Sequence, residues 1–316
     1  MKAKGAGLAQ RRNDTTGDGR RGDTGPGDTR PYLCIPYWAA PRFPGDEVDI
    51  GFVRALPNDV VSWECPGIHA SPYEPGKELE VTVDVRNSGH GNTPVIATVV
   101  VYWADPTVGF AKPHFFAVGT VAAPPMRDPS QPGVVNVTMR ATIPAWAPNH
   151  VCLLAYVTHS LDPATLVMDP INDRHWAQRN LIAVSTAKGP VLVPFVVANP
   201  LQTEGVFELK ARVYERRELE LLSYRMKLEP TETALRMRIA DGLGKAATEA
   251  ERNLVRTNLA LGAGKQRRYS LVFEPETPLI EDRMVAIEVT LVTGGDRDRI
   301  VGSLGIVVTG KADPFN

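Results

Sequence analysis

Apolar and polar residues alternate over several stretches of the N-terminal half of the chain, as in β-strands with one buried and one solvated face. Turn-forming residues at 87–92 predict that the strands on either side of them form a hairpin. The many prolines between the alternating stretches exclude long helices. We predict strands at 79–86, 95–103, 135–143 and 151–157.

The alternation continues after residue 200, where the strand candidates are numerous enough for an immunoglobulin-like sandwich. Between Thr248 and Val255 the apolar residues instead have the spacing of one or two turns of amphipathic helix, which we expect to cross between sheets. The strand candidates lie at 207–213, 222–228, 233–239, 269–273, 285–291 and 300–308.

Composition changes near residue 199, and we place a domain boundary there. Of the 27 prolines, 23 lie in residues 1–200, as do all five tryptophans and all three cysteines. Residues 1–30 contain almost no large apolar side chain, so they cannot offset the entropy of ordering. We therefore predict an all-β protein with two immunoglobulin-like antiparallel β-sandwiches in tandem. Its parts are a disordered tail at 1–30, a proline- and aromatic-rich arm at 31–45, a first sandwich at 46–199 and a second at 200–316.

Several short motifs in the first predicted sandwich resemble those of the bacterial CARDB-like (cell-adhesion-related) domains. The resemblance covers roughly residues 46–186. It implies an immunoglobulin-type sandwich that serves as an interaction or spacer module, often in surface proteins, and it carries no catalytic residues. The motifs are Tyr73-Glu74-Pro75-Gly76, the stretches 83–89 and 101–106, the stretch 150–155, and the stretch 173–181.

Charge and hydropathy exclude several classes of partner. The chain has 35 basic and 36 acidic side chains and a net charge of -1, which disfavours binding to nucleic acid or to an anionic bilayer. No stretch reaches the roughly 18 apolar residues of a membrane span, and the early residues lack the apolar core of a secretory signal. We expect a cytoplasmic protein, with a surface location by a non-classical route as the alternative.

The sequence does not predict an enzyme. It has no Gly-x-Ser-x-Gly nucleophile motif, and its three cysteines and six histidines lack the paired spacing of a zinc site. Cys65 and His69 are the least unfavourable nucleophile and base. Cys34 and Cys65 would pair only in an oxidising compartment. The tripeptide Arg21-Gly22-Asp23, which integrin-type receptors read, is expected by chance in so biased a tail.

Aromatic residues give the main functional hypothesis, a non-catalytic structural or protein-interaction module. The arm at 31–45 should dock either on its own sandwich or on a neighbouring subunit, which would build a homo-oligomer by arm exchange. Carbohydrate binding through aromatic platforms is the alternative. The candidate partner-binding residues are Tyr32, Tyr37, Trp38, Phe43, Phe110, Phe115 and Phe116.

A third hypothesis is a calcium-stiffened spacer, and no other cofactor is expected. The loop at 162–173 carries Asp169, Asn172 and Asp173, whose carboxylate and amide oxygens are the ligands that calcium prefers. The loop lacks the spacing and the glycine of an EF-hand. Side-chain caps of the Asx-turn type are the simpler interpretation of these residues.

Overall fold

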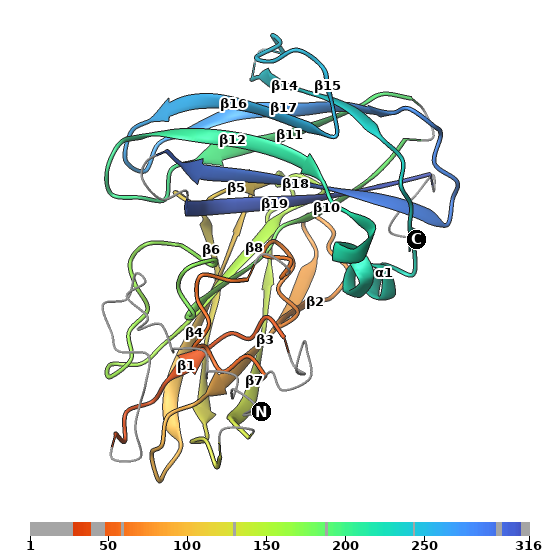
Figure 1. The fold of residues 1–316 in the computed structure, drawn as a ribbon. Coiled ribbons are helices and arrows are strands. Elements are labelled where there is room, and N and C mark those ends of the chain that lie inside the picture. Colours follow the sequence, from red (N-terminus) through yellow and green to blue (C-terminus); the bar gives the residue numbers. More distant parts are fainter. Residues whose placement is uncertain are drawn as a thin grey trace, which may run out of the picture.

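The computed structural model describes residues 28–38, 48–57, 60–128, 131–186, 189–242, 244–294 and 299–310. Most of the predicted tail, with the tripeptide at 21–23, lies outside these residues, as does Phe43. The described chain is almost entirely β, with four sheets arranged as two stacked pairs, so the predicted fold class is confirmed. Figure 1 shows the second pair lying across one end of the first.

The first sandwich is built from two four-stranded sheets, which we call sheet I and sheet II. In sheet I, β3 (Glu78–Asn87) pairs with β1 (Leu33–Cys34), β2 (Ile68–Ala70) and β7 (Gly133–Thr142). Sheet II has the order β6 (His114–Ala123), β4 (Val95–Ala104), β8 (Cys152–Thr158) and β9 (Trp176–Arg179). The inward residues of β3 and of β4 enter one apolar core between the two sheets.

The second sandwich is also built from two sheets, which we call sheet III and sheet IV. Sheet III has the order β15 (Glu251–Arg252), β14 (Leu235–Asp241), β17 (Gln266–Pro275), β11 (Val191–Ala198) and β5 (Thr107–Val108). Sheet IV has the order β10 (Leu181–Ser185), β19 (Arg299–Thr309), β18 (Arg283–Thr293), β12 (Gly205–Val213) and β16 (Leu254–Leu261), and β13 (Glu229–Pro230) pairs with β18.

The predicted hairpin over 79–103 is wrong. β3 and β4 belong to opposite sheets, and residues between them cross from one sheet to the other. The Asn87 side chain accepts the backbone N–H groups of Tyr32 and Gly89, so the turn is held by the N-terminal arm instead of by a two-stranded ladder. Alternation fixes which face of a strand is buried, but it does not say which sheet the strand joins.

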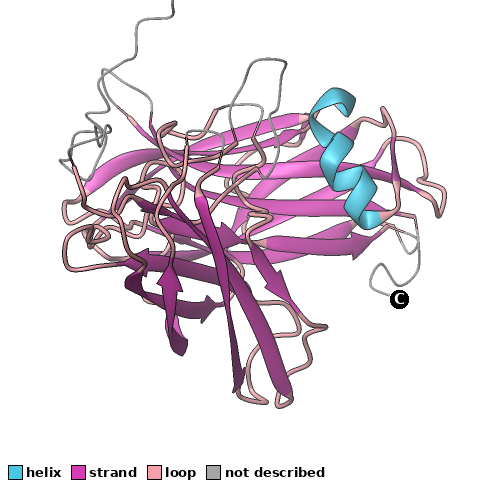
Figure 2. Ribbon diagram, turned by 90° about the horizontal axis from the view of Figure 1, so that it is seen from below, coloured by secondary structure: helices cyan, strands magenta, loops and turns pink. Residues whose placement is uncertain are grey.

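Two elements of the second sandwich differ from the prediction: a predicted strand is a helix, and a predicted helix is strand. Residues 222–228, predicted as a strand, lie largely in the helix α1 (Glu220–Met226), which follows the 3₁₀ turn η1 (Arg216–Leu219). Leu219, Leu222 and Met226 also have helical spacing, and there they cover Trp63. Residues 248–255, predicted as a helix, instead contain β15 and the start of β16. Figure 2 shows the helical segment in cyan beside the sheets.

Strands β10 and β11, which precede residue 199, join the second sandwich, as β5 does. β10 runs parallel to β19, and β11 runs antiparallel to β17. The boundary predicted at residue 199 assigned both strands to the first sandwich. That boundary was placed where prolines become rare along the chain. Pro194, however, lies within β11, at a point where the strand pairs with β17 on one side and with no strand on the other. The unpaired side of a strand tolerates a residue that lacks an N–H donor.

Trp63 joins the two sandwiches. It lies in the loop before β2, is completely buried, and enters a small core formed by sheet IV and α1. Its indole N–H donates to the Tyr214 hydroxyl at 3.1 Å, and that hydroxyl donates to Glu288 at 2.7 Å. The ring lies directly against Gly305, where any larger residue would overlap it. A glycine in the middle of β19 is therefore required by this close approach.

Candidate functional site

Most of the aromatic residues predicted to bind a partner lie inside the protein, so their burial corrects the expectation of a surface role. The apolar arm residues pack within their own chain, and the rings at 110 and 116 enter the two main cores. Phe115 is 59% exposed. The buried candidates are Tyr32, Tyr37, Trp38, Phe110 and Phe116.

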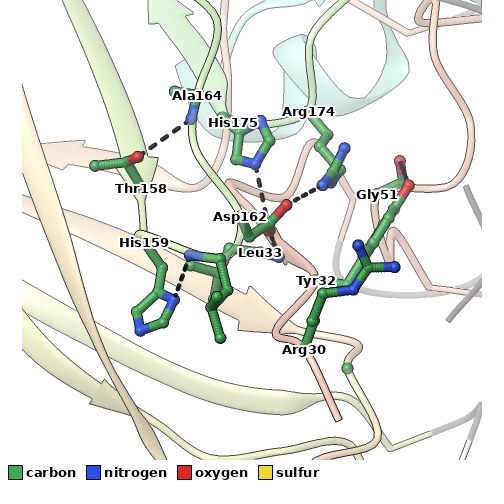
Figure 3. Close-up of polar contacts among 12 residues, drawn as sticks. Arg30, Tyr32, Leu33, Gly51, Thr158, His159, Asp162, Ala164, Arg174 and His175 are labelled. Atoms are coloured by element: carbon green, nitrogen blue, oxygen red, sulfur yellow. Dashed lines mark hydrogen bonds and ion pairs between the residues drawn. The ribbon is translucent and has the colours of Figure 1, made fainter. Parts of the chain in front are cut away.

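The described part of the arm, residues 31–38, is held by buried charges, as Figure 3 shows for one of two clusters. Asp162 accepts the Leu33 backbone N–H at 2.7 Å and pairs with Arg174 at 2.5 Å. The Arg174 guanidinium lies 3.7 Å from the centre of the Tyr32 ring. The arm thus docks on its own sandwich, one of the two arrangements expected from the sequence.

Asp49 forms the second anchor of the arm. Its carboxylate accepts the Tyr37 backbone N–H at 2.7 Å and pairs with Arg54, and both charged side chains are almost completely buried. Arg86 donates to the backbone carbonyl of Asp49 at 2.7 Å. The arm has few ladder partners because it is short and proline-rich, so carboxylates satisfy N–H groups that a neighbouring strand would otherwise satisfy.

His175 lies between two carboxylates next to the arm. Its Nδ1 is 2.7 Å from Asp173 and its Nε2 is 3.3 Å from Asp162. Burial acts to lower the pKa of His175, but the two carboxylates outweigh it and raise that pKa above its ordinary value. The same contacts hold the pKa of Asp173 and of Asp162 below the ordinary value despite burial. This cluster stabilises the arm.

The residues proposed for calcium are engaged in separate contacts. Asp169 accepts two bonds from the Asn172 amide, at 2.8 and 3.0 Å, and pairs with Arg299. Asp173 instead accepts the Thr165 hydroxyl and contacts His175. Among the described residues, no group of three or more His, Cys, Asp or Glu side chains is arranged to hold a metal ion. Calcium binding stays a prediction that these contacts do not test.

The least unfavourable catalytic pair is not assembled. The Cys65 thiol is buried, donates to the Pro36 carbonyl oxygen, and has its pKa raised far above the ordinary value by burial. His69 lies on the surface with Asp84, 3.1 Å away. All three cysteines are free and buried. The cleft beside α1, about 890 Å³ in volume, has no histidine or cysteine among its described lining residues.

The outward face of sheet II is the surface that stands out in the first sandwich. Alternate residues of its strands enter the core, so the residues between them face outward. Ile96, Phe115 and Val118 are 63%, 59% and 55% exposed. No outward position of β4, β6 or β8 carries a charge. These positions are Ile96, Thr98, Val100 and Tyr102 on β4, Phe115, Val118, Thr120 and Ala122 on β6, and Leu154, Tyr156 and Thr158 on β8. Leu154 is covered by the core of the second sandwich and Val100 is buried, so the exposed part of the face lies mainly on β4 and β6.

An aromatic row crosses this face. The ring centres of Phe115 and Tyr102 are 6.3 Å apart in an edge-on arrangement, and those of Tyr102 and Tyr156 are 6.3 Å apart in a stacked one. Tyr156 in turn lies 4.6 Å from Trp176, which is buried against the second sandwich. The row therefore begins at an exposed ring and ends in the core, which fixes the exposed ring in place.

The outward face of sheet I has the opposite character. Glu80 pairs with Arg140 at 2.5 Å across β3 and β7, and His69 contacts Asp84 across β2 and β3. A bond of 2.8 Å joins the Thr82 and Thr138 hydroxyls between these pairs. The sequence did not distinguish the two faces, because residues 95–104 are almost all apolar and their inward and outward positions look alike.

Comparisons with known proteins do not identify this chain. No family model matches it, and no curated protein is similar to it, so the CARDB-like resemblance rests on the quoted motifs alone. Similar solved structures include the collagen adhesin of S. aureus (8% identity, TM-score 0.24, 78% of this chain and 93% of that chain). The E. coli adhesin CfaE, in a mutant form, has 8% identity and a TM-score of 0.26, covering 80% of this chain and 85% of that chain.

The tip adhesin CupB6 of Pseudomonas aeruginosa has 9% identity and a TM-score of 0.19, covering 77% of this chain and 94% of that chain. Scores this low do not indicate a common fold, and what those proteins bind carries no information about this chain. Among the described residues, no helix is both long enough and apolar enough to cross a membrane.

Proposed function

We propose that this protein is a non-catalytic interaction module that binds another protein through the outward face of sheet II. The contrast between the two outer faces of one sandwich carries the proposal. Sheet I places ion pairs on its outer face, whereas sheet II places apolar, aromatic and threonine side chains there. A contiguous apolar patch on a soluble protein is typical of an interaction site.

The chemistry of the face defines the partner. A charged partner surface would lose water on this face without gaining an opposite charge, so the partner is a protein surface that is itself apolar and uncharged. Phe115 is suited to be the anchor, because its ring is exposed and is fixed from behind by Tyr102.

The size of the face indicates the strength of the interaction. The exposed part of the face lies mainly on two strands, β4 and β6, about 4.8 Å apart; followed over seven residues from Ile96 to Tyr102, they give a flat area of roughly 230 Å². A stable interface buries about 800 Å² on each partner. A contact of this size falls among weak and transient interfaces.

Two charge substitutions with matched exposure test the proposal. Val118→Glu places a carboxylate on sheet II, and Val134→Glu places one on the outward face of sheet I, where the native side chains are 55% and 60% exposed. A partner captured by the wild-type chain is then purified and its dissociation constant is measured with each variant. We expect V118E to weaken binding at least tenfold and V134E to leave it within twofold.

Equal binding by both variants would refute the proposed face, as would the absence of any partner that distinguishes them. Sedimentation of the isolated protein determines whether the partner is a second copy. If self-association persists in V118E, the face of sheet II is not the contact between copies.

A further inference from the structure

A second aromatic site lies near the end of the first sandwich that meets the second. Of the five tryptophans, Trp146 alone is exposed, at 68%, while the other four are at most 7% exposed. It lies between β7 and β8 in a short segment bounded by Pro144 and Pro148. The Ala147 backbone N–H donates to the Pro144 carbonyl, and the Tyr73 hydroxyl donates to the Pro148 carbonyl at 2.9 Å. The segment therefore presents the indole from a fixed backbone.

Trp146 and His114 form an aromatic corner over Trp103. The His114 ring stacks on Trp103, with centres 4.4 Å apart and planes 22° apart. The Trp146 ring is 5.7 Å from His114 at 72°, and 5.5 Å from Trp103 at 51°. Since Trp103 is buried, it serves as the base, and the planes of the two exposed outer rings meet at 72°.

The same histidine lines a small cleft with polar walls. Asp105, Lys112 and Gln266 also line it, and its volume is about 60 Å³. Within the described part of the chain, the side chains of Asp105 and Lys112 make no hydrogen bond or ion pair. A water molecule needs about 10–15 Å³ by such a measure, so the cleft accepts a few polar atoms and not a whole ring.

We infer that this corner is a carbohydrate subsite, in which a pyranose ring stacks on Trp146 and directs a hydroxyl or hydroxymethyl group into the cleft beside His114. The apolar C–H face of the sugar covers the exposed indole. The carboxylate, ammonium and amide of the cleft supply both acceptors and donors, which a hydroxyl group requires and an apolar protein side chain does not. The subsite is separate from the face of sheet II and goes beyond the protein interaction proposed above.

The single exposed tryptophan makes the test direct. The full chain is applied to an array of neutral gluco-, galacto- and manno-oligosaccharides, and iodide quenching of tryptophan emission is measured with the glycans that are retained. We expect at least one glycan to be retained and to protect Trp146 from iodide. Trp146→Ala should weaken that retention at least tenfold.

Tyr224→Ala is the matched control, because Tyr224 is an exposed aromatic residue at 86% on α1 and lies away from the corner. It should leave retention within twofold, and Gln266→Ala should weaken it by threefold or more. Failure of every glycan to be retained by the wild-type chain, or equal retention by W146A, overturns the inference. Neither result depends on the binding measured with V118E, so failure of the carbohydrate subsite can be distinguished from failure of the protein-binding face of sheet II.

Discussion

The contact between Trp63 and Gly305 predicts that one added methyl group loosens the attachment of the two sandwiches. A Cβ at residue 305 would lie within 3.0 Å of three ring carbons of Trp63, which real Cβ atoms essentially never do. Carbon atoms in contact are separated by about 3.5–4.0 Å, so the ring must shift by about 1 Å or more. The ring cannot move outward, because it is completely buried.

The magnitude follows from two effects of Gly305→Ala. Overpacking of a well-packed core costs about 1–3 kcal/mol. A displaced indole also weakens its 3.1 Å bond to Tyr214, and a hydrogen bond of this kind contributes about 1 kcal/mol. We therefore expect the free energy of unfolding to fall by roughly 2–4 kcal/mol.

Urea unfolding, followed by circular dichroism and by tryptophan emission, measures this change. Gly294→Ala is the control, because a Cβ there would have its nearest contact at 3.5 Å, the Val206 carbonyl oxygen. In the double variant Gly305→Ala/Trp63→Phe the smaller ring should leave room for the methyl group. The loss of unfolding free energy in the double variant should therefore be smaller than the sum of the losses in the two single variants. Strict additivity, or a loss within about 0.5 kcal/mol of the control, would show that the contact does not join the sandwiches.

Three further outcomes follow from the buried polar groups. Because the pKa of His175 is raised by folding, its contribution is complete below about pH 6.5 and is lost as pH rises through its higher folded pKa. The melting temperature of the wild-type chain should therefore fall on the alkaline side, and that of His175→Gln should fall less. An unchanged profile in H175Q would contradict this. Asp162→Asn should lower the free energy of unfolding by about 3–5 kcal/mol, because it leaves buried cations without their partner. Glu80→Gln, at the exposed ion pair with Arg140, should lower it by under about 1 kcal/mol. Urea unfolding measures both losses, and similar values would argue that Asp162 does not anchor the arm. The thiols of Cys34, Cys65 and Cys152 are buried, so they should react with a soluble disulfide reagent only after the protein is unfolded. Rapid reaction under native conditions would refute this prediction.

The candidate sites were only partly visible in the sequence. Phe115 was among the predicted partner-binding residues, and the structure leaves its ring exposed. Ile96 and Val118 were not singled out, because an apolar residue in a strand does not reveal whether its face is covered. Trp146 was one of several aromatics in the first sandwich, and its exposure depends on how its proline-bounded segment packs.

Local alternation determined the β class, most strand positions and the inward face of each strand, because a period of two is a property of neighbouring residues. It did not decide between strand and helix at 222–228, where both spacings fit, and the tertiary contact with Trp63 selected the helix.

Only the tertiary structure decided which sheet each strand joins, since pairing depends on contacts between residues distant in sequence. β10 and β11 therefore joined the second sandwich despite the composition of their segment. The same long-range packing buried the aromatic arm and left the face of sheet II and the Trp146 corner in contact with solvent.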